Sequence, residues 1–297
     1  APRGRVTEGP VFFIPRTRAR ILPIVMQQTT AGLLTDHYPP ESAKFKAPLM
    51  LVHGLWSTSR CWHRWATHFC NLGWHCLAVN LRGRSGQNPF EDLRRLTFDS
   101  CVEDLRTIMK SAAFPPVVLG LNLGAAVVLK AAETTKAAAL VLVSPAPLGA
   151  LEAARSRPRR LLRLKYLPLI YLRRPFRIDE KDFTAYFLTG LAKGLQQEIF
   201  QRTVPDSSFL VREFLAPSTS LNRDSLTCPI LTLAGEADQI CPAAATRDLA
   251  VWLGADWKEY AAQGHWLLEQ DSEAIVRDIH RWLVQKLGDE ILLADVV

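Results

Sequence analysis

Short apolar runs alternate with helix-like segments along most of this 297-residue chain. Apolar runs of about 4–8 residues, bounded by glycine, proline or polar residues, are typical of buried strands. We expect strands at residues 11–14, 21–26, 48–54, 76–81, 116–121, 138–143, 230–234 and 257–260. We expect helices at residues 58–72, 98–111, 123–132 and 272–286. This alternation predicts an α/β fold with a mostly parallel central sheet and helices on both faces.

One long segment interrupts the alternation. Residues 148–226 are helix-like and basic, which is the pattern of a helical lid inserted into a core made of residues 1–147 and 227–297. Pro168 lies inside the segment, so we expect two short helices or a kinked one there. Within residues 155–181, ten Lys and Arg residues face only two acidic residues, although the whole chain carries +7. The chain outside residues 155–181 therefore carries no net positive charge.

Composition excludes several classes of protein. The chain is 48% hydrophobic and 22% charged, which is typical of a globular protein and excludes a wholly disordered one. It has no uncharged apolar run of about 18 residues, so a membrane-spanning helix is not expected. Six cysteines without a CxxC pair, and no evident secretory signal, favour a cytoplasmic protein with reduced thiols.

Four short motifs, each at the end of an expected strand, carry the residues suited to catalysis. His53-Gly54 ends the strand 48–54, and the sequence GLNLG (residues 120–124) joins a strand to a helix. Asp238 follows the strand 230–234, and His265 lies in the loop after the last strand. Because the carboxyl ends of parallel strands meet at one edge of a sheet, these motifs are expected to gather there.

The order of these motifs resembles the α/β-hydrolase superfamily, in particular its lid-bearing branch, from about Pro48 to Lys286. The sequences LVHGLW, LRGRSG and the GH pair before Trp266 carry the resemblance. It implies that Asp238 orients His265 as a base. No Walker A motif, GxGxxG sequence or metal-ligand cluster appears, so no cofactor is expected. It also implies an oxyanion hole formed by the backbone N–H of Leu123 and that of Leu55 or Trp56.

The chain departs from the superfamily at one position. The usual elbow is G-x-S-x-G, with the nucleophile at its centre, whereas Asn122 stands there in this sequence. An amide nitrogen is delocalised into its carbonyl and cannot be activated by an imidazole as a serine hydroxyl can. No ordinary acyl-enzyme is therefore expected. Ser144 is not expected to replace the nucleophile, because the resemblance places it at the lid entrance, away from the base.

Three interpretations of Asn122 remain open. In the leading one, Asn122, Asp238 and His265 form a catalytic set in which the His–Asp dyad is a general base on an apolar carbonyl substrate. Elimination, cyclisation, decarboxylation, C–C cleavage or cofactor-free oxygenation would suit it. In the second, a serine-type ester or thioester hydrolase, or an Asp-type hydrolase, is disabled by substitution at Asn122. In the third, the chain is a non-catalytic pseudoenzyme that binds a ligand or partner.

The expected partner is a small hydrophobic substrate. The aromatic residues Trp56 and Trp266 lie near the catalytic loops, and Phe183 and Phe187 lie in the lid, so we expect them to line the pocket. The basic lid is compatible with an anionic group on the substrate, an acyl carrier or a membrane surface. Nucleic acid is not expected, because no aromatic stacking platform accompanies the charge. No metal ligand cluster is recognised, since the Cys61–Cys70 segment lacks zinc-site spacing.

Overall fold

A single sheet organises the protein. The computed structural model describes residues 25–84, 89–148 and 157–293. Within them, the sheet has the strand order β1-β2-β4-β3-β5-β6-β7-β8; the pairs β1–β2 and β2–β4 are antiparallel and the other five pairs are parallel. The strands are β1 Met26–Thr30, β2 Leu33–Tyr38, β3 Leu49–Val52, β4 Cys76–Val79, β5 Val117–Leu121, β6 Ala139–Val143, β7 Ile230–Gly235 and β8 Asp256–Tyr260. The predicted mostly parallel sheet is confirmed.

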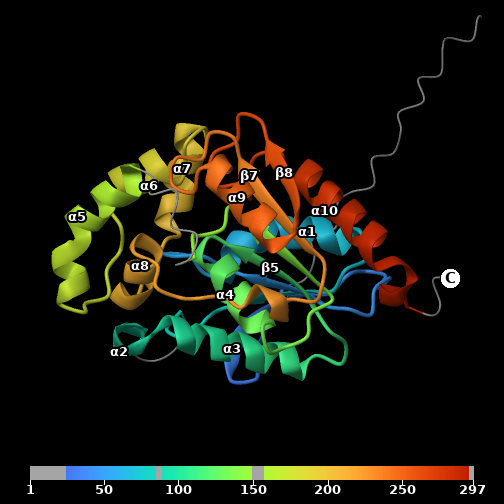
Figure 1. Cartoon of the computed structure of the whole chain (residues 1–297). Coiled ribbons are helices and arrows are strands. Elements are labelled where there is room, and N and C mark those ends of the chain that lie inside the picture. Colours follow the sequence, from blue (N-terminus) through green and yellow to red (C-terminus); the bar gives the residue numbers. More distant parts are fainter. Residues whose placement is uncertain (1–24, 85–88, 149–156, 294–297) are drawn as a thin grey trace, which may run out of the picture.

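Helices cover both faces of this sheet (Figure 1). The helices α1 and α10 pack together on one face, and α3 and α4 pack together on the other. The core helices are α1 His63–Asn71, α2 Pro89–Arg95, α3 Phe98–Ser111, α4 Leu123–Ala132, α9 Ala243–Leu253 and α10 Ser272–Leu287. Short 3-10 turns accompany them at η1 Ser59–Trp62, η3 Arg223–Ser225 and η4 Gly288–Ile291.

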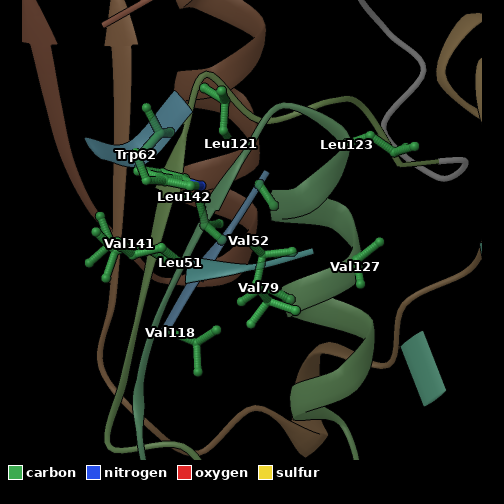
Figure 2. Close-up of a cluster of buried hydrophobic side chains, with 14 of the residues drawn as sticks. Leu51, Val52, Trp62, Val79, Val118, Leu121, Leu123, Val127, Val141 and Leu142 are labelled. Carbon is green, nitrogen blue, oxygen red and sulfur yellow. The ribbon is translucent and has the colours of Figure 1, made fainter. Parts of the chain in front are cut away.

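The core is densest around the four central strands. Every residue of β3, β4, β5 and β6 is buried, because helices cover both faces of these parallel strands. Figure 2 shows part of this core, including Val52 of β3, Val79 of β4, Val118 of β5 and Val127 of α4. This buried centre gives the loops at the strand ends a rigid base.

Several elements differ from the sequence expectation. The expected strand 11–14 and most of the expected strand 21–26 lie outside the described residues, and β1 begins at Met26. The strand β2 and the helices α2 and α9 were not predicted. Polar residues obscure β2, since Thr35, Asp36 and His37 are buried in it. Thr35 and His37 are hydrogen-bonded to each other, and the hydroxyl of Ser59 donates to Oδ2 of Asp36, while Oδ1 of Asp36 has no partner among the described residues.

A helical insertion separates β6 from β7. It consists of α5 Arg157–Tyr171, α6 Glu180–Tyr186, α7 Lys193–Gln201 and α8 Ser208–Leu215, and these helices lie together at one end of the sheet in Figure 1. We call these four helices and their connections the insertion. Pro168 lies within α5 without dividing it, so of the two expected alternatives, a pair of short helices or a kinked one, the pair is not formed. The backbone of Phe176 and that of Asp206 exchange two hydrogen bonds, which join the segment before α6 to the segment before α8.

The insertion carries apolar residues on its outer surface. Leu164, Leu167 and Tyr171 of α5 are 70%, 49% and 84% exposed, respectively. Leu162 and Tyr166 of the same helix are buried, so α5 attaches by one side only. Within the described residues, none of the helices combines the length and the apolar character that crossing a bilayer requires.

Close backbone contact at Gly124 yields the first prediction. A Cβ atom at Gly124 would lie 2.5 Å from the carbonyl oxygen of His53 and 2.6 Å from that of Val52. Backbone atoms of a buried strand cannot move aside cheaply, so Gly124→Ala should lower the free energy of unfolding by about 1–3 kcal/mol in urea denaturation. Gly194→Ala in α7 is the matched control, since a Cβ atom added there would meet no heavy atom within 4 Å. An equal effect of both substitutions would contradict the close-contact argument.

Candidate active site

The turn between β5 and α4 holds Asn122 in a conformation that side chains rarely adopt. Its φ is 51° and its ψ is −118°, outside the left-handed helical region as well. Such a backbone costs about 1–3 kcal/mol and persists only where its surroundings impose it. Here, Gly120 lies so close to Ala125, and Gly54 so close to the Leu121 carbonyl, that neither position has room for a Cβ. The strained turn predicted for an elbow is therefore present around Asn122.

The predicted acid and base meet beside this turn. Nδ1 of His265 lies 2.7 Å from Oδ2 of Asp238, and both side chains are almost completely buried. The other carboxylate oxygen of Asp238 accepts the backbone N–H groups of Ile240 and Cys241, each at 2.9 Å. Asp238 is thus fixed in orientation by its own loop, and it in turn fixes the imidazole ring.

Asn122 lies at hydrogen-bond distance from the other imidazole nitrogen. Its Nδ2 is 3.1 Å from Nε2 of His265. Because Nδ1–H donates to Asp238, Nε2 is the lone-pair nitrogen, and the amide N–H of Asn122 donates to it. The Asn122 Oδ1 atom is buried and has no hydrogen-bond partner within the described part of the chain. The three predicted catalytic residues are therefore brought together, and one acceptor atom among them is left free.

The two halves of the expected oxyanion hole differ. Leu123 begins α4, so its backbone N–H lies at a helix N-terminus, where the helix dipole favours negative charge. Leu55 is also close, because it lines a void of about 10 Å³ together with Leu123. The backbone N–H of Trp56, however, donates to Oδ2 of Asp206 at 2.7 Å. Of the two alternatives expected for this half of the hole, the Trp56 N–H is therefore engaged by Asp206 in this structure, and Leu55 is the donor used in the proposal below.

Aromatic side chains of the insertion cover the base. The ring of Phe187 stands edge-on to His265 at 5.2 Å and to Trp56 at 5.5 Å. Phe183 stacks on Phe187 at 5.2 Å and contacts Trp266 at 6.1 Å. The four aromatic residues predicted to bind substrate therefore form one cluster with His265. Because His265 is only 1% exposed, the imidazole is closed off from solvent in this structure.

Other polar residues near the site have structural roles. The Ser144 hydroxyl donates to the backbone carbonyl of His265 at 2.9 Å, so it holds the histidine loop. His53 is wholly buried; its Nδ1 donates to the Gly54 carbonyl, and its Nε2 accepts the Leu81 N–H at 3.3 Å. Arg84 and Asp206 contact the Trp56 loop, and the sequence did not indicate them as site residues. The two residues are 122 positions apart, so no local pattern marks their pairing.

One cluster of metal-binding residue types occurs among the described residues. Oδ of Asp238, Sγ of Cys241 and a ring nitrogen of His265 lie within 4.8 Å of one another. Burial, and then the charge of Asp238, raise the pKa of the Cys241 thiol well above its ordinary value. A thiol that stays protonated is a poor ligand, and Asp238 and His265 already bond to each other, so we interpret the cluster as a hydrogen-bonded network.

An acid–base pair at the carboxyl end of a parallel sheet, next to a strained strand–helix turn, defines a class of α/β enzymes. The family model described as the alpha/beta hydrolase family matches residues 49–278. The chain therefore belongs to the alpha/beta hydrolase family. This confirms the resemblance recognised in the sequence. None of the curated protein sequences matches the chain.

Solved structures with this fold include several hydrolases. Monoglyceride lipase from Saccharomyces cerevisiae has a TM-score of 0.69 and 13% identity, covering 94% of this chain and 99% of that chain. An N-acyl homoserine lactonase complexed with N-hexanoyl homoserine has a TM-score of 0.67 and 15% identity over 90% and 98%. MenH from S. aureus has a TM-score of 0.65 and 20% identity over 86% and 99%. Identities this low show a shared fold.

The buried His53 yields a prediction on pH dependence. Burial, with the nearby Arg84 charge, lowers the pKa of His53 to about 3 from 6.5. Between these values the unfolded chain binds a proton that the folded chain does not, so stability is complete above about pH 6.5 and falls as the pH falls. His53→Gln should reduce the slope of unfolding free energy between pH 6 and 4 by about 1.4 kcal/mol per pH unit. An unchanged slope in urea denaturation would contradict a neutral buried His53.

Proposed function

We propose that this protein is an alpha/beta hydrolase family enzyme that uses His265, oriented by Asp238, as a general base without forming an acyl-enzyme. The observation that carries the proposal is the 2.7 Å contact between Nδ1 of His265 and Oδ2 of Asp238, in a chain with an amide at the nucleophile position. A buried carboxylate held by two backbone N–H groups keeps its imidazole in the tautomer with a free Nε2 lone pair.

The proposed reaction begins with proton transfer from an apolar carbonyl compound. Nε2 of His265 takes the proton from the carbon next to the carbonyl, and the C–H electron pair moves into the carbonyl to give an enolate. The backbone N–H groups of Leu123 and Leu55 support the negative oxygen. The enolate then expels a leaving group in an elimination, attacks an electrophilic carbon in a cyclisation, or reacts with O₂. In a decarboxylation or a C–C cleavage the enolate forms instead from the C–C electron pair, as CO₂ or an acyl fragment leaves, and the protonated His265 then returns a proton to its carbon.

Asn122 has two roles in this proposal. Its amide N–H donates to Nε2 of His265 in the closed site and leaves that nitrogen when the substrate arrives. Its Oδ1 atom, buried without a partner among the described residues, accepts a hydrogen bond from a substrate N–H or O–H. An unpaired buried oxygen costs about 1–3 kcal/mol, so a donor on the substrate is favoured there.

Proton exchange with solvent tests the proposal without knowledge of the product. The protein should incorporate deuterium from D₂O next to the carbonyl of apolar ketones or thioesters, as measured by mass spectrometry. His265→Ala should lower the exchange rate by roughly 10²-fold or more, because the base is lost. Asp238→Asn should lower it as well, since the orienting charge is removed.

Thr135→Val provides a control for folding, since Thr135 is buried in the connection between α4 and β6, at the opposite end of the strands from the catalytic residues. Exchange that is unchanged in His265→Ala contradicts the general-base proposal. Ligand binding without any exchange or product dependent on His265 would instead favour a binding protein.

A second candidate function is that of an ester hydrolase whose catalytic residues are all present except the nucleophile at position 122. The position of Asn122, on a strained turn at 3.1 Å from His265, favours this alternative. Structural neighbours that are described as an esterase, a lipase and a lactonase add support.

Asn122→Ser tests this alternative. A hydroxyl at position 122 would lie beside Nε2 of His265 and near the Leu123 N–H, so a competent site should then hydrolyse p-nitrophenyl esters in a burst assay. The double variant Asn122→Ser with His265→Ala should be inactive. No gain in hydrolysis by a folded Asn122→Ser variant would reject the second candidate.

A further inference from the structure

A buried ion pair joins the insertion to the core beside the candidate oxyanion hole. Nη2 of Arg84 lies 2.7 Å from Oδ2 of Asp206, and their side chains are 1% and 0% exposed. The same carboxylate oxygen also accepts the backbone N–H of Trp56 at 2.7 Å. Two donors of the core, one of them charged, therefore converge on one oxygen atom that the insertion supplies.

Part of the Arg84 guanidinium is unused. Its Nε donates to the Ser57 carbonyl and its Nη2 donates to Asp206, but its buried Nη1 has no hydrogen-bond partner among the described residues. Arg84 and Asp206 line the void of about 10 Å³ that Leu55 and Leu123 also line. This volume holds about one water molecule, so in the closed structure the space next to the oxyanion donors has no room for a substrate group.

We propose that Arg84 and the Trp56 N–H form a carboxylate-binding subsite of the substrate pocket, and that Asp206 occupies it when no substrate is bound. The substrate class is then an apolar carbonyl compound that carries a carboxylate. One oxygen of that carboxylate takes the place of Asp206 Oδ2, and the other pairs with Nη1 of Arg84. The arginine fork thus gains the second contact that Asp206 does not provide.

Charge balance requires the two carboxylates to exchange. Arg84 supplies one positive charge, so a substrate carboxylate added beside Asp206 would leave an excess negative charge in a buried site, which is costly. Asp206, in this proposal, leaves the pocket with the insertion once the Ser207 hydroxyl releases the Leu96 carbonyl. Its backbone is tied to Phe176 by two hydrogen bonds, so its carboxylate moves with this part of the insertion.

The exchange of Asp206 for a substrate carboxylate also affects how a substrate reaches His265. Phe187, which covers His265, belongs to the same insertion as Asp206. Moreover, the Val204 N–H donates to the Trp56 carbonyl at 3.0 Å, so the segment just before Asp206 contacts the same core loop. A substrate that displaces Asp206 therefore weakens the contact that keeps the insertion over the base.

Equilibrium binding of hexanoate tests the subsite, with hexanamide as the neutral probe of the same shape. In isothermal titration calorimetry, Asp206→Asn should bind hexanoate about tenfold or more tightly than the unsubstituted protein does, because the competing charge is removed. Hexanamide should bind both proteins equally. Adding Arg84→Met to Asp206→Asn should abolish the gain for hexanoate.

Three outcomes would overturn the proposal. The first is equal affinity for hexanoate in the unsubstituted protein and in Asp206→Asn. The second is a gain in hexanoate affinity that persists when Arg84→Met is added. The third is loss of hexanoate binding in Arg160→Met of α5, with no loss in Arg84→Met. If Asp206→Asn does not unfold cooperatively, Asp206→Ser replaces it in the same comparison, since its hydroxyl can still accept a hydrogen bond.

The inference rests on the proposed function only in treating the space beside Leu55 and Leu123 as the substrate pocket. Binding requires no turnover, so a failure of the general-base chemistry would leave the hexanoate result intact. Conversely, deuterium exchange on substrates without a carboxylate can succeed when the hexanoate test fails.

Discussion

The close approach of the β5–α4 turn to the end of β3 is the constraint on which the candidate site depends. Gly124 lies against the carbonyl oxygens of Val52 and His53, and Gly54 lies against the Leu121 carbonyl. These contacts hold Asn122 at a positive φ and bring the Leu123 N–H next to the His53-Gly54 loop. The site is therefore built by backbone packing, and the identity of the side chain at position 122 does not decide whether the turn forms.

The second constraint comes from the insertion, which completes the site by closing it. Phe187 covers His265 with an aromatic edge, and Asp206 fills the space beside the oxyanion donors with a carboxylate. One contact is apolar and the other is a buried ion pair, whose desolvation offsets much of its Coulomb energy. In the proposed exchange, an apolar contact and an ionic contact with the substrate replace these two contacts of the insertion, so the net free-energy cost of opening is low.

The sequence predicts those parts of the fold and the site that depend on interactions between residues close in sequence. The central strands, the elbow, Asp238 and His265 were accessible, since apolar runs and short motifs are local in sequence. The strand β2 was missed because its buried polar residues, such as Asp36, find partners only in the folded protein. For the same reason, nothing in the sequence marked Asp206 as a residue of the site, or showed that its carboxylate accepts the Trp56 N–H.

The position of positive charge matters more than its amount. The arginines of α5 create a basic surface, yet surface charges act weakly and are screened by salt. Arg84 carries a single charge, but it is buried next to the candidate oxyanion donors, and it contributes to the low pKa of His53. A buried charge interacts through a medium of low polarisability, so it discriminates strongly between an anionic and a neutral ligand. In the proposed subsite, recognition of an anionic substrate therefore belongs to Arg84, and the basic surface of α5 is left to affect only the approach of the ligand.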